Sequence, residues 1–386
     1  MNRQRFVQLS IGGLAGVHSP TLPLAAWGSL TGPFRQELTV DAGRLARSMR
    51  MLATFGANDA GGIDRVAFSD ANVEALDWIA RLLSDTGFST EIDLAGNLIA
   101  QKAGTDSSLL PVMFGSHIDS VPGGGNYDGQ VGSMSSVEVA ATFAAAGIVT
   151  RHPLEIAIFS NEEGGKTGSR ALAGEVEAFE LDIETASGLT IGEGLKRLGG
   201  DPDRLGDARR ERGSLAAFLE LHIEQGAVLD TDGFDIGIVE GIVGIMRWNV
   251  TVDGVTNHAG TTPMDRRSDA MVAAARFVDL VHRTAREAPG RQVATVGRLT
   301  AEPGVPNVIP GRVTLTLEIR DLSMDGIERL YEAIRERSES IAEESRTAFS
   351  FDRFYTSRAA PTDERIQARV ASAAAGLGLS ARAMPS

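Results

Sequence analysis

The 386-residue sequence contains no cysteine and only three lysines, and aromatic residues make up 5% of it. Without cysteine there is no disulfide framework, no thiolate nucleophile and no cysteine-type zinc or iron–sulfur site. Any transition metal must therefore be bound by histidine, aspartate or glutamate. The scarcity of lysine also leaves few candidates for Schiff-base chemistry.

Long apolar runs and an excess of positive charge are also missing. No stretch of 18 or more apolar residues occurs, so no membrane-spanning helix is expected. The net charge of −14 argues against a general nucleic-acid binder, which needs a basic surface. We therefore expect neither a nucleic acid nor a membrane as a partner.

Residues 1–34 differ in composition from the rest of the chain. A basic start is followed by a Gly- and Ala-rich apolar stretch, and the first acidic residue is Glu37. This pattern resembles a bacterial export signal of the twin-arginine kind, with Gln4 in the place of the second arginine. The alternatives are a disordered tail and a stray translation start. An export signal would imply a periplasmic location.

Residues 35–234 are predicted to form an α/β domain. Two short apolar runs bounded by turn residues, 110–117 and 153–163, are typical of buried strands, and a helical pattern over 133–147 separates them. This order predicts a mostly parallel sheet with helices on both faces. Functional groups in such sheets collect beyond the carboxyl ends of the strands.

Near residue 235 the pattern changes. Strand, helix, two strands and a further helix follow one another over residues 235–345. This order predicts an inserted α+β domain of the split-βαβ kind. Residues 346–386 are expected to return to the first domain.

Three polar residues flank a glycine-rich turn in GSHIDSVPGGGNYDG. His117 and Asp119 alternate along a strand, so Asp119 can hold one imidazole nitrogen while the other binds a metal. The glycines at 123–125 permit a tight return that brings Asp128 to the same place. A His-x-Asp pair alone is more often structural, but together with the loop and Asp128 we interpret it as a metal site.

Further candidates lie in SNEEGG and LELHIEQG. Glu162 and Glu163 are adjacent, so they must be exposed or neutralised by a cation. One can bind a metal while the other acts as a general base, although a lone Glu-Glu pair is usually a solvated loop. His222 stands in an apolar segment, where an isolated histidine is more often a hydrogen-bonded core residue.

The inserted domain contributes three candidates. His258 is followed by small residues, as in a loop built for close approach, and a structural turn is the alternative. Asn307 and Arg320 lie thirteen residues apart and flank one turn and one strand. Arginine suits bidentate capture of a carboxylate, to which an amide can add. Either residue could instead be a surface group.

Together these motifs resemble one family. GSHIDSVPGGGNYDG, NEEGG, HIEQG, NHAGTTPM with DRRSDA, and PNVIP with the later arginine are similar to the M20-type metallohydrolases. Within them, HIEQG and HAGTTPM resemble the amidase branch of N-carbamoyl-L-amino acid amidohydrolases, ureidopropionases and allantoate amidohydrolases. The resemblance covers about residues 40–386. It implies hydrolysis of the C–N bond of ureido substrates, a cytoplasmic location and a homodimer formed by the inserted lid domain.

The resemblance also implies a role for each metal-site residue. Two divalent ions, of zinc, manganese, cobalt or nickel, would be bound. The first ion would be held by His117, Asp128 and His222. Asp128 would bridge to the second ion at Glu163, and Glu162 would be the general acid and base.

The remaining motif residues would contact the substrate. By resemblance, Gln225, Asn307 and Arg320 would hold it, the last two at its carboxylate. His258 would reach into the active site of the partner subunit.

Two departures from the family pattern leave the activity open. Relatives continue after Met-Pro-Ser with a His-Asp pair that completes the second metal site, whereas this sequence ends at Ser386. The loop after Glu163 is also shorter than in relatives. One hypothesis is a metal-dependent amidase of N-carbamoyl-L-amino acids. Another is an impaired relative that binds a carboxylate ligand or only dimerises, and a third is an allantoate amidohydrolase or aminoacylase-type amidase.

Overall fold

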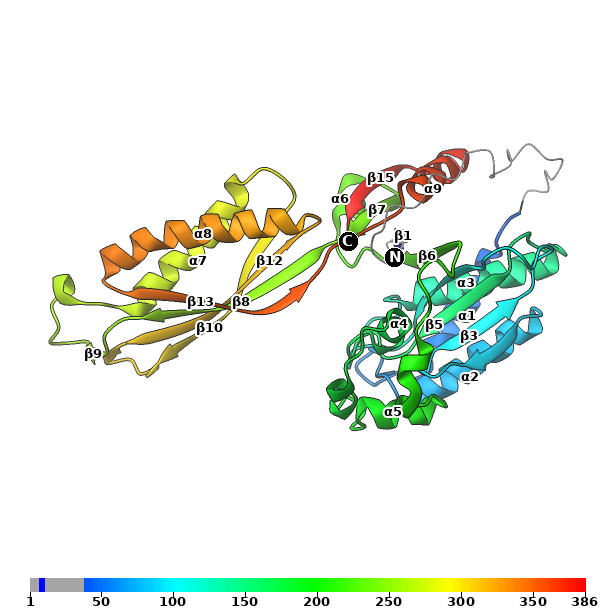
Figure 1. Ribbon diagram of the computed structural model, residues 1–386, viewed down its shortest axis with the longest axis horizontal. Helices are drawn as coiled ribbons and strands as arrows, with labels where there is room; N and C mark the ends of the chain where they lie inside the picture. Colours follow the sequence, from blue (N-terminus) through cyan, green and yellow to red (C-terminus); the bar gives the residue numbers. More distant parts are fainter. Residues whose placement is uncertain (1–6, 11–37) are drawn as a thin grey trace. The chain divides into compact units, whose positions relative to one another are not determined.

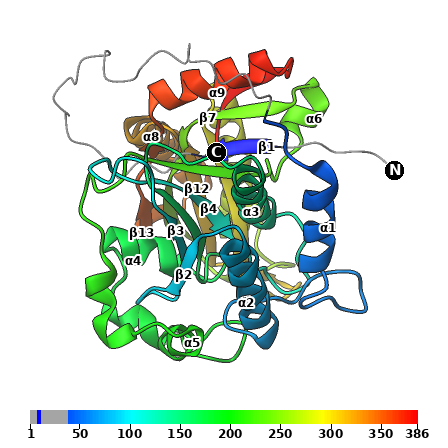
Figure 2. The same cartoon turned by 90° about the vertical axis from the view of Figure 1, so that its right-hand side faces the viewer.

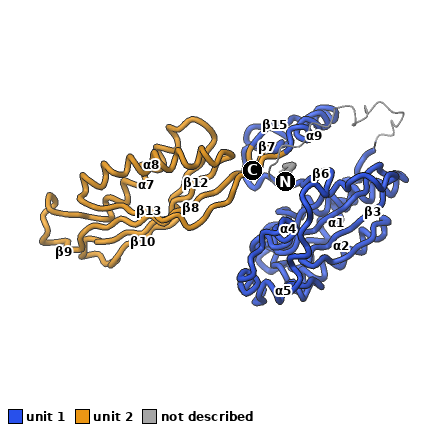
Figure 3. The backbone as a smooth tube through the Cα atoms, viewed as in Figure 1, with its two compact units in different colours: residues 1–239, 363–384 blue, residues 240–362, 385–386 orange. Residues whose placement is uncertain are grey.

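The computed structural model describes residues 7–10 and 38–386. They form two compact units (Figure 3): unit 1 comprises residues 1–239 and 363–384, and unit 2 comprises residues 240–362 and 385–386. The predicted leader lies outside the described residues except for its positions 7–10. Within these ranges, no helix is both long enough and apolar enough to cross a membrane.

Unit 1 is built around one sheet (Figures 1 and 2). In chain order its helices and strands are β1 (Val7–Ser10), α1 (Ala42–Leu52), α2 (Asp70–Asp85), β2 (Ser89–Ile92), β3 (Leu98–Lys102), β4 (Val112–His117), α3 (Gln130–Ala145), β5 (Leu154–Phe159), α4 (Thr167–Ala173), α5 (Ile191–Leu198), β6 (Ala217–His222), α6 (Val228–Asp232), β7 (Ile236–Ile242), α9 (Glu364–Gly376) and β15 (Ala381–Pro385). Short 3-10 helices occupy Ala178–Asp182 and Pro202–Ala208.

The sheet is mixed, whereas the sequence suggests a mostly parallel one. Its strand order is β14-β7-β1-β6-β4-β5-β3-β2, where β14 is the short strand Ala360–Pro361, and β15 also pairs with β7. At its centre β4 is parallel to both β5 and β6. At one edge β2 and β3 form an antiparallel hairpin because the chain turns tightly between Asp93 and Asn97. The three central strands nevertheless end at one edge, where the predicted polar residues lie.

Helices pack on one face of the central strands. Residues of α1, α2, α3 and α5 share one apolar cluster with alternate residues of β3, β4 and β5. The residues between these point to the opposite face, where Ile99, Met113 and Ala157 pack with side chains from strands and a loop. The expected second helical layer is therefore not seen over these strands in the part of the chain that the structure describes.

Unit 2 is a two-layer α+β unit. In chain order its elements are β8 (Gly244–Asp253), β9 (Asn257–His258), a 3-10 turn (Met264–Arg266), α7 (Ala270–Glu287), β10 (Val293–Glu302), β11 (Val308–Ile309), β12 (Arg312–Asp321), α8 (Met324–Ser345), β13 (Ala348–Ser357) and β14 (Ala360–Pro361). The sheet β10-β12-β8-β13 is fully antiparallel. Alternate residues of β8 and β12 are buried in one cluster with α7 and α8, and Trp248 stacks on Tyr331 with 4.4 Å between ring centroids.

The inserted unit continues further than the sequence suggests. The return to the first domain is expected at residue 346, but β13 still pairs along β8 in unit 2. The continuous segment of unit 2 ends at Thr362, and Asp363 begins the return to unit 1. The reason is that β8 is an inner strand, and β13 supplies the hydrogen-bonding partner on the side away from β12.

Candidate metal centre

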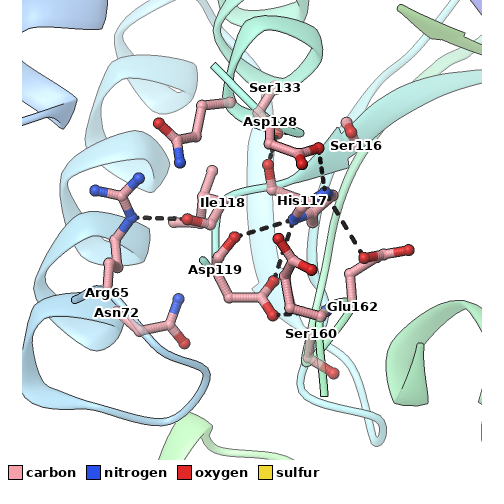
Figure 4. Close-up of polar contacts among 12 residues, drawn as sticks. Arg65, Asn72, Ser116, His117, Ile118, Asp119, Asp128, Ser133, Ser160 and Glu162 are labelled. Atoms are coloured by element: carbon pink, nitrogen blue, oxygen red, sulfur yellow. Dashed lines mark hydrogen bonds and ion pairs between the residues drawn. The ribbon is translucent and has the colours of Figure 1, made fainter. Parts of the chain in front are cut away.

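Three predicted ligands meet at the edge where β4 and β6 end, and Figure 4 shows two of them, His117 and Asp128. His117 is the last residue of β4, His222 is the last residue of β6, and Asp128 lies in the loop before α3. One ligand atom from each residue lies within 4.8 Å of the other two. Asp128 Oδ1 is 3.1 Å from His222 Nε2 and 4.0 Å from His117 Nε2.

Backbone carbonyls orient both imidazoles. His117 Nδ1 lies 3.1 Å from the carbonyl oxygen of Asp119, and His222 Nδ1 lies 2.9 Å from that of Ile223. A carbonyl oxygen only accepts hydrogen bonds, so each Nδ1 carries the proton. In the neutral rings, Nε2 therefore has the lone pair that a metal needs, and both Nε2 atoms face Asp128.

The two oxygens of the Asp128 carboxylate have different neighbours: Oδ2 faces Gln225, and Oδ1 faces the two histidines. Gln225 Nε2 donates to Oδ2 at 2.7 Å. Oδ1 is buried and faces the two imidazole Nε2 atoms, which can donate to it only when the rings are protonated. One carboxylate oxygen and two imidazole nitrogens are ligands that suit divalent zinc, manganese, cobalt or nickel. The residues present therefore fit one divalent cation.

Acidic groups outnumber the two histidines at this edge. Glu162 Oε2 is 3.8 Å from His117 Nε2 (Figure 4). The backbone N–H of Glu163 donates to Asp119 Oδ2 at 3.1 Å. Asp119 is 1% exposed. This surplus of negative charge favours a bound cation.

The acids change the protonation of the histidines. Burial opposes protonation of His117, but the hydrogen bond and charge of Asp119, with the charges of Glu162 and Glu220, outweigh it and raise its pKa to about 9. Burial likewise opposes a charge on His222, yet the bond to Asp128 raises its pKa. Burial also raises the pKa of Glu163. Without a cation, protons therefore balance part of the negative charge.

Two glycines let α3 approach the strand ends. A Cβ on Gly129, whose φ is +71°, would lie 2.2 Å from His117 Nε2. A Cβ on Gly132 would lie 2.0 Å from the carbonyl oxygen of Leu221. Such distances are far inside van der Waals contact, so only glycine fits. The predicted turn glycines are those at 123–125, whereas Gly129, directly after Asp128, is the sequence signal for this approach.

Two charged residues at the site, Glu220, which is partly buried, and Arg65, which is fully buried, are not predicted from the sequence. Glu220 accepts a hydrogen bond from Ser116 Oγ at 2.6 Å, and burial raises its pKa. Its position two residues before His222 on a strand was a usable signal, because such residues share a face. Arg65 is fully buried, and burial lowers its pKa to about 10, against the opposing charge of Asp119. Nothing in its sequence neighbourhood marks it.

Two predicted substrate residues are neighbours in unit 2. β9 and β11 pair so that His258 lies opposite Val308, and the N–H of Ala259 donates to the carbonyl oxygen of Asn307 at 3.0 Å. His258 Nδ1 accepts a hydrogen bond from the N–H of Gly260 at 3.1 Å. In the neutral ring the proton is therefore on Nε2, which can act as a donor, and His258 is exposed.

Arg320 lies at the other end of unit 2. Its Nε donates to Glu318 Oε1 at 2.7 Å, and Arg247 Nε donates to Glu318 Oε2 at 2.6 Å. Arg320 is eight residues from Arg312, where β12 starts beside the β9–β11 pair, which corresponds to about 27 Å of strand. Within one chain, Arg320 and Asn307 are therefore far apart. The paired acid and second arginine, Glu318 and Arg247, were not predicted.

Comparison with known proteins places this geometry in context. Residues 113–386 match peptidase family M20/M25/M40. The N-carbamoyl-L-amino acid amidohydrolase of Geobacillus stearothermophilus is 40% identical over 80% of this chain and 77% of its own length.

Solved structures are similar over most of the chain. A hydantoinase/carbamoylase family amidase from Burkholderia ambifaria has a TM-score of 0.83 and 34% identity, covering 90% of this chain and 86% of its own. The structure of AtUAH in complex with glyoxylate has a TM-score of 0.69 and 31% identity, with coverages of 90% and 86%.

Proposed function

Because the chain belongs to peptidase family M20/M25/M40, in its hydantoinase/carbamoylase branch, we propose that it hydrolyses N-carbamoyl-L-amino acids at the C–N bond. The observation that carries this proposal is the His117, Asp128 and His222 cluster at the strand ends of such a fold. Water adds to the ureido carbon, and the bond from that carbon to the amino-acid nitrogen breaks. The products are the L-amino acid and carbamate, which decomposes to ammonia and carbon dioxide.

Different residues would bind the metal and transfer the proton. When bound, a divalent cation lowers the pKa of water and polarises a carbonyl. His117, Asp128 and His222 would hold one such cation, and Glu163 would contribute to a second. Glu162 would accept a proton from the attacking water and deliver it to the leaving nitrogen.

The substrate would be recognised by its carboxylate. Arg320 suits bidentate binding, and its Nη atoms are left for a ligand because Glu318 takes Nε. The structure of AtUAH with glyoxylate supports a carboxylate ligand for this branch. Gln225 lies at the metal centre, in reach of a substrate there, and Asn307 and His258 would act from the partner chain of a homodimer.

The test is ammonia release after metal reconstitution. Protein stripped with a chelator is loaded with Mn²⁺, Co²⁺, Ni²⁺ or Zn²⁺ and given a panel of N-carbamoyl-L-amino acids, with the D-enantiomers as controls. We expect equal amounts of ammonia and L-amino acid. No ammonia from any member of the panel with any of the metals rejects the proposal.

Adding allantoate and N-acetyl amino acids to the panel separates the alternatives. Turnover of allantoate alone indicates an allantoate amidohydrolase, and turnover of N-acetyl amino acids alone indicates an aminoacylase-type amidase. Metal or carboxylate binding without any turnover indicates a catalytically impaired relative.

A further inference from the structure

A segment far from the ligands in sequence holds the loop that joins them. Ile63 and Gly124 exchange two backbone hydrogen bonds, each of 3.0 Å. The N–H of Ser120 donates to the carbonyl oxygen of Arg65, also at 3.0 Å. The N–H of Gly123 donates to Asp64 Oδ1 at 2.6 Å. Residues 63–65 therefore lie along residues 118–124, between the ligands His117 and Asp128.

The side chain of Arg65 fastens this segment from inside. It is 0% exposed. Nε donates to the carbonyl oxygen of Ile118 at 2.7 Å (Figure 4). Nη1 donates to the carbonyl oxygens of Leu52 and Phe55, both at 2.8 Å. One guanidinium thus ties the end of α1 to the residue that follows His117.

The position of Ile118 explains why this contact bears on the metal centre. Ile118 lies between His117 and Asp119, and the carbonyl oxygen of Asp119 sets the orientation of the His117 ring. A shift of the backbone at Ile118 therefore moves both the ligand and the group that orients it. Loss of a contact that orients a ligand typically lowers metal affinity by about 10- to 100-fold.

A buried guanidinium is costly, and none of its hydrogen-bond acceptors here is a carboxylate. An apolar side chain would fill the same space without that cost. It would leave the carbonyl oxygens of Ile118 and Phe55 without the guanidinium donor, while that of Leu52 would keep only the N–H of Phe55. The planar fork of arginine reaches several acceptors at once, whereas lysine is a single point donor. The three carbonyl groups therefore account for an arginine at this position.

We propose that Arg65 is a positioning residue for the metal centre, which fixes the backbone at Ile118 and so aims His117 Nε2 at the bound cation. The inference rests on the metal-binding part of the proposed function. It does not depend on which substrate is hydrolysed.

The test compares two variants, in each of which one arginine is replaced by lysine. Arg65→Lys is expected to bind Zn²⁺ or Mn²⁺ at least about tenfold more weakly than the unaltered chain in competition with a chromophoric chelator. Arg44→Lys is the control, because Arg44 also ties α1 to the body of the unit, through Glu138, without contacting the metal loop. Circular dichroism and the Tm of the metal-free proteins establish that the variants fold.

The outcomes are distinct. A folded Arg65→Lys with unchanged metal affinity overturns this inference and leaves the proposed function standing, as does an equal loss in Arg44→Lys. Absence of metal binding by the unaltered chain overturns both. If Arg65→Lys does not fold, hydrogen exchange on the unaltered chain decides. Zn²⁺ must slow exchange in residues 62–66, which contain no ligand, and unchanged exchange there overturns the inference.

Discussion

At the scale of single residues, backbone carbonyls and carboxylates act together on the two imidazoles of the metal centre. Carbonyl oxygens of Asp119 and Ile223 orient the rings, and Asp119 Oδ1 also lies 3.4 Å from His117 Nδ1. The carboxylates supply the negative charge that balances a cation. Because those carboxylates raise the pKa of His117 to about 9, the empty site holds a proton that an incoming metal must displace.

This competition predicts that metal binding strengthens with pH. Below pH 9 the metal-free His117 is protonated, so the apparent affinity for Mn²⁺ should fall by up to about tenfold per pH unit for each proton displaced. Above that pH the contribution of His117 ends. Dissociation constants measured from about pH 6 to about pH 9 check this.

Asp119→Asn provides the control for this prediction. It removes the main hydrogen bond and charge that raise the pKa of His117, so the pH dependence should move to lower pH. If the unaltered chain binds Mn²⁺ with the same affinity between about pH 6 and about pH 8, the assignment of His117 as a ligand is wrong.

Glu162→Gln should abolish turnover without emptying the site. The amide cannot accept the proton from water, and loss of a general acid and base lowers kcat by about 100- to 10,000-fold. Metal content, measured by elemental analysis, should stay unchanged. Glu163→Gln is the matched control. Because Glu163 is the proposed ligand of the second cation, this variant should lose metal content, whereas Glu162→Gln should not. Full activity of Glu162→Gln would exclude its proposed role.

At the scale of elements, strand ends could be predicted because they are coded locally. Apolar runs followed by polar residues locate His117 and Glu162 at the ends of β4 and β5. Partner choice is not local. The antiparallel pairing of β3 with β5, and of β13 with β8, depends on contacts between distant segments. For the same reason Arg65 escaped prediction, since its acceptor Ile118 is 53 residues away.

The turn that carries His258 is held by one arginine. Arg267 Nη2 donates to the carbonyl oxygen of Ala259 at 2.7 Å, and Nε donates to that of Thr262 at 3.1 Å. With Nδ1 engaged by Gly260, the exposed Nε2–H of the neutral ring can donate to negative charge that develops on a substrate carbonyl.

Arg267→Lys should therefore lower kcat by about 10- to 100-fold, because a small misplacement of such a donor is costly, while metal affinity is retained. Steady-state kinetics and a metal titration check the two expectations. Arg266→Lys is the control, because the neighbouring side chain makes neither of these contacts with the turn. Equal kinetics for the two variants would remove the proposed role of Arg267.

At the scale of the whole molecule, the length of β12 limits which residues of one chain can contact the same substrate molecule. His258 and Asn307 lie at the β9–β11 pair that precedes the first residue of β12, and Arg320 lies eight residues along β12, about 27 Å from that first residue. An N-carbamoyl amino acid is much shorter than this. If all three residues contact the same substrate, they must come from two chains, which favours a homodimer with shared active sites.

Mixed dimers test this sharing. Glu162→Gln and His258→Ala chains, each expected to be inactive alone, are co-expressed with different tags, and only mixed dimers are collected by tandem purification. If His258 serves the partner, the site of the His258→Ala chain has its own Glu162 and receives an intact His258 from the Glu162→Gln chain. The other site lacks both groups, so the mixed dimer should show about half of the unaltered activity. If His258 serves its own chain, each site lacks one group and the mixed dimer is inactive.

Pairing the Glu162→Gln chain with a Glu162→Gln/His258→Ala chain gives the background, since neither chain then supplies a general base.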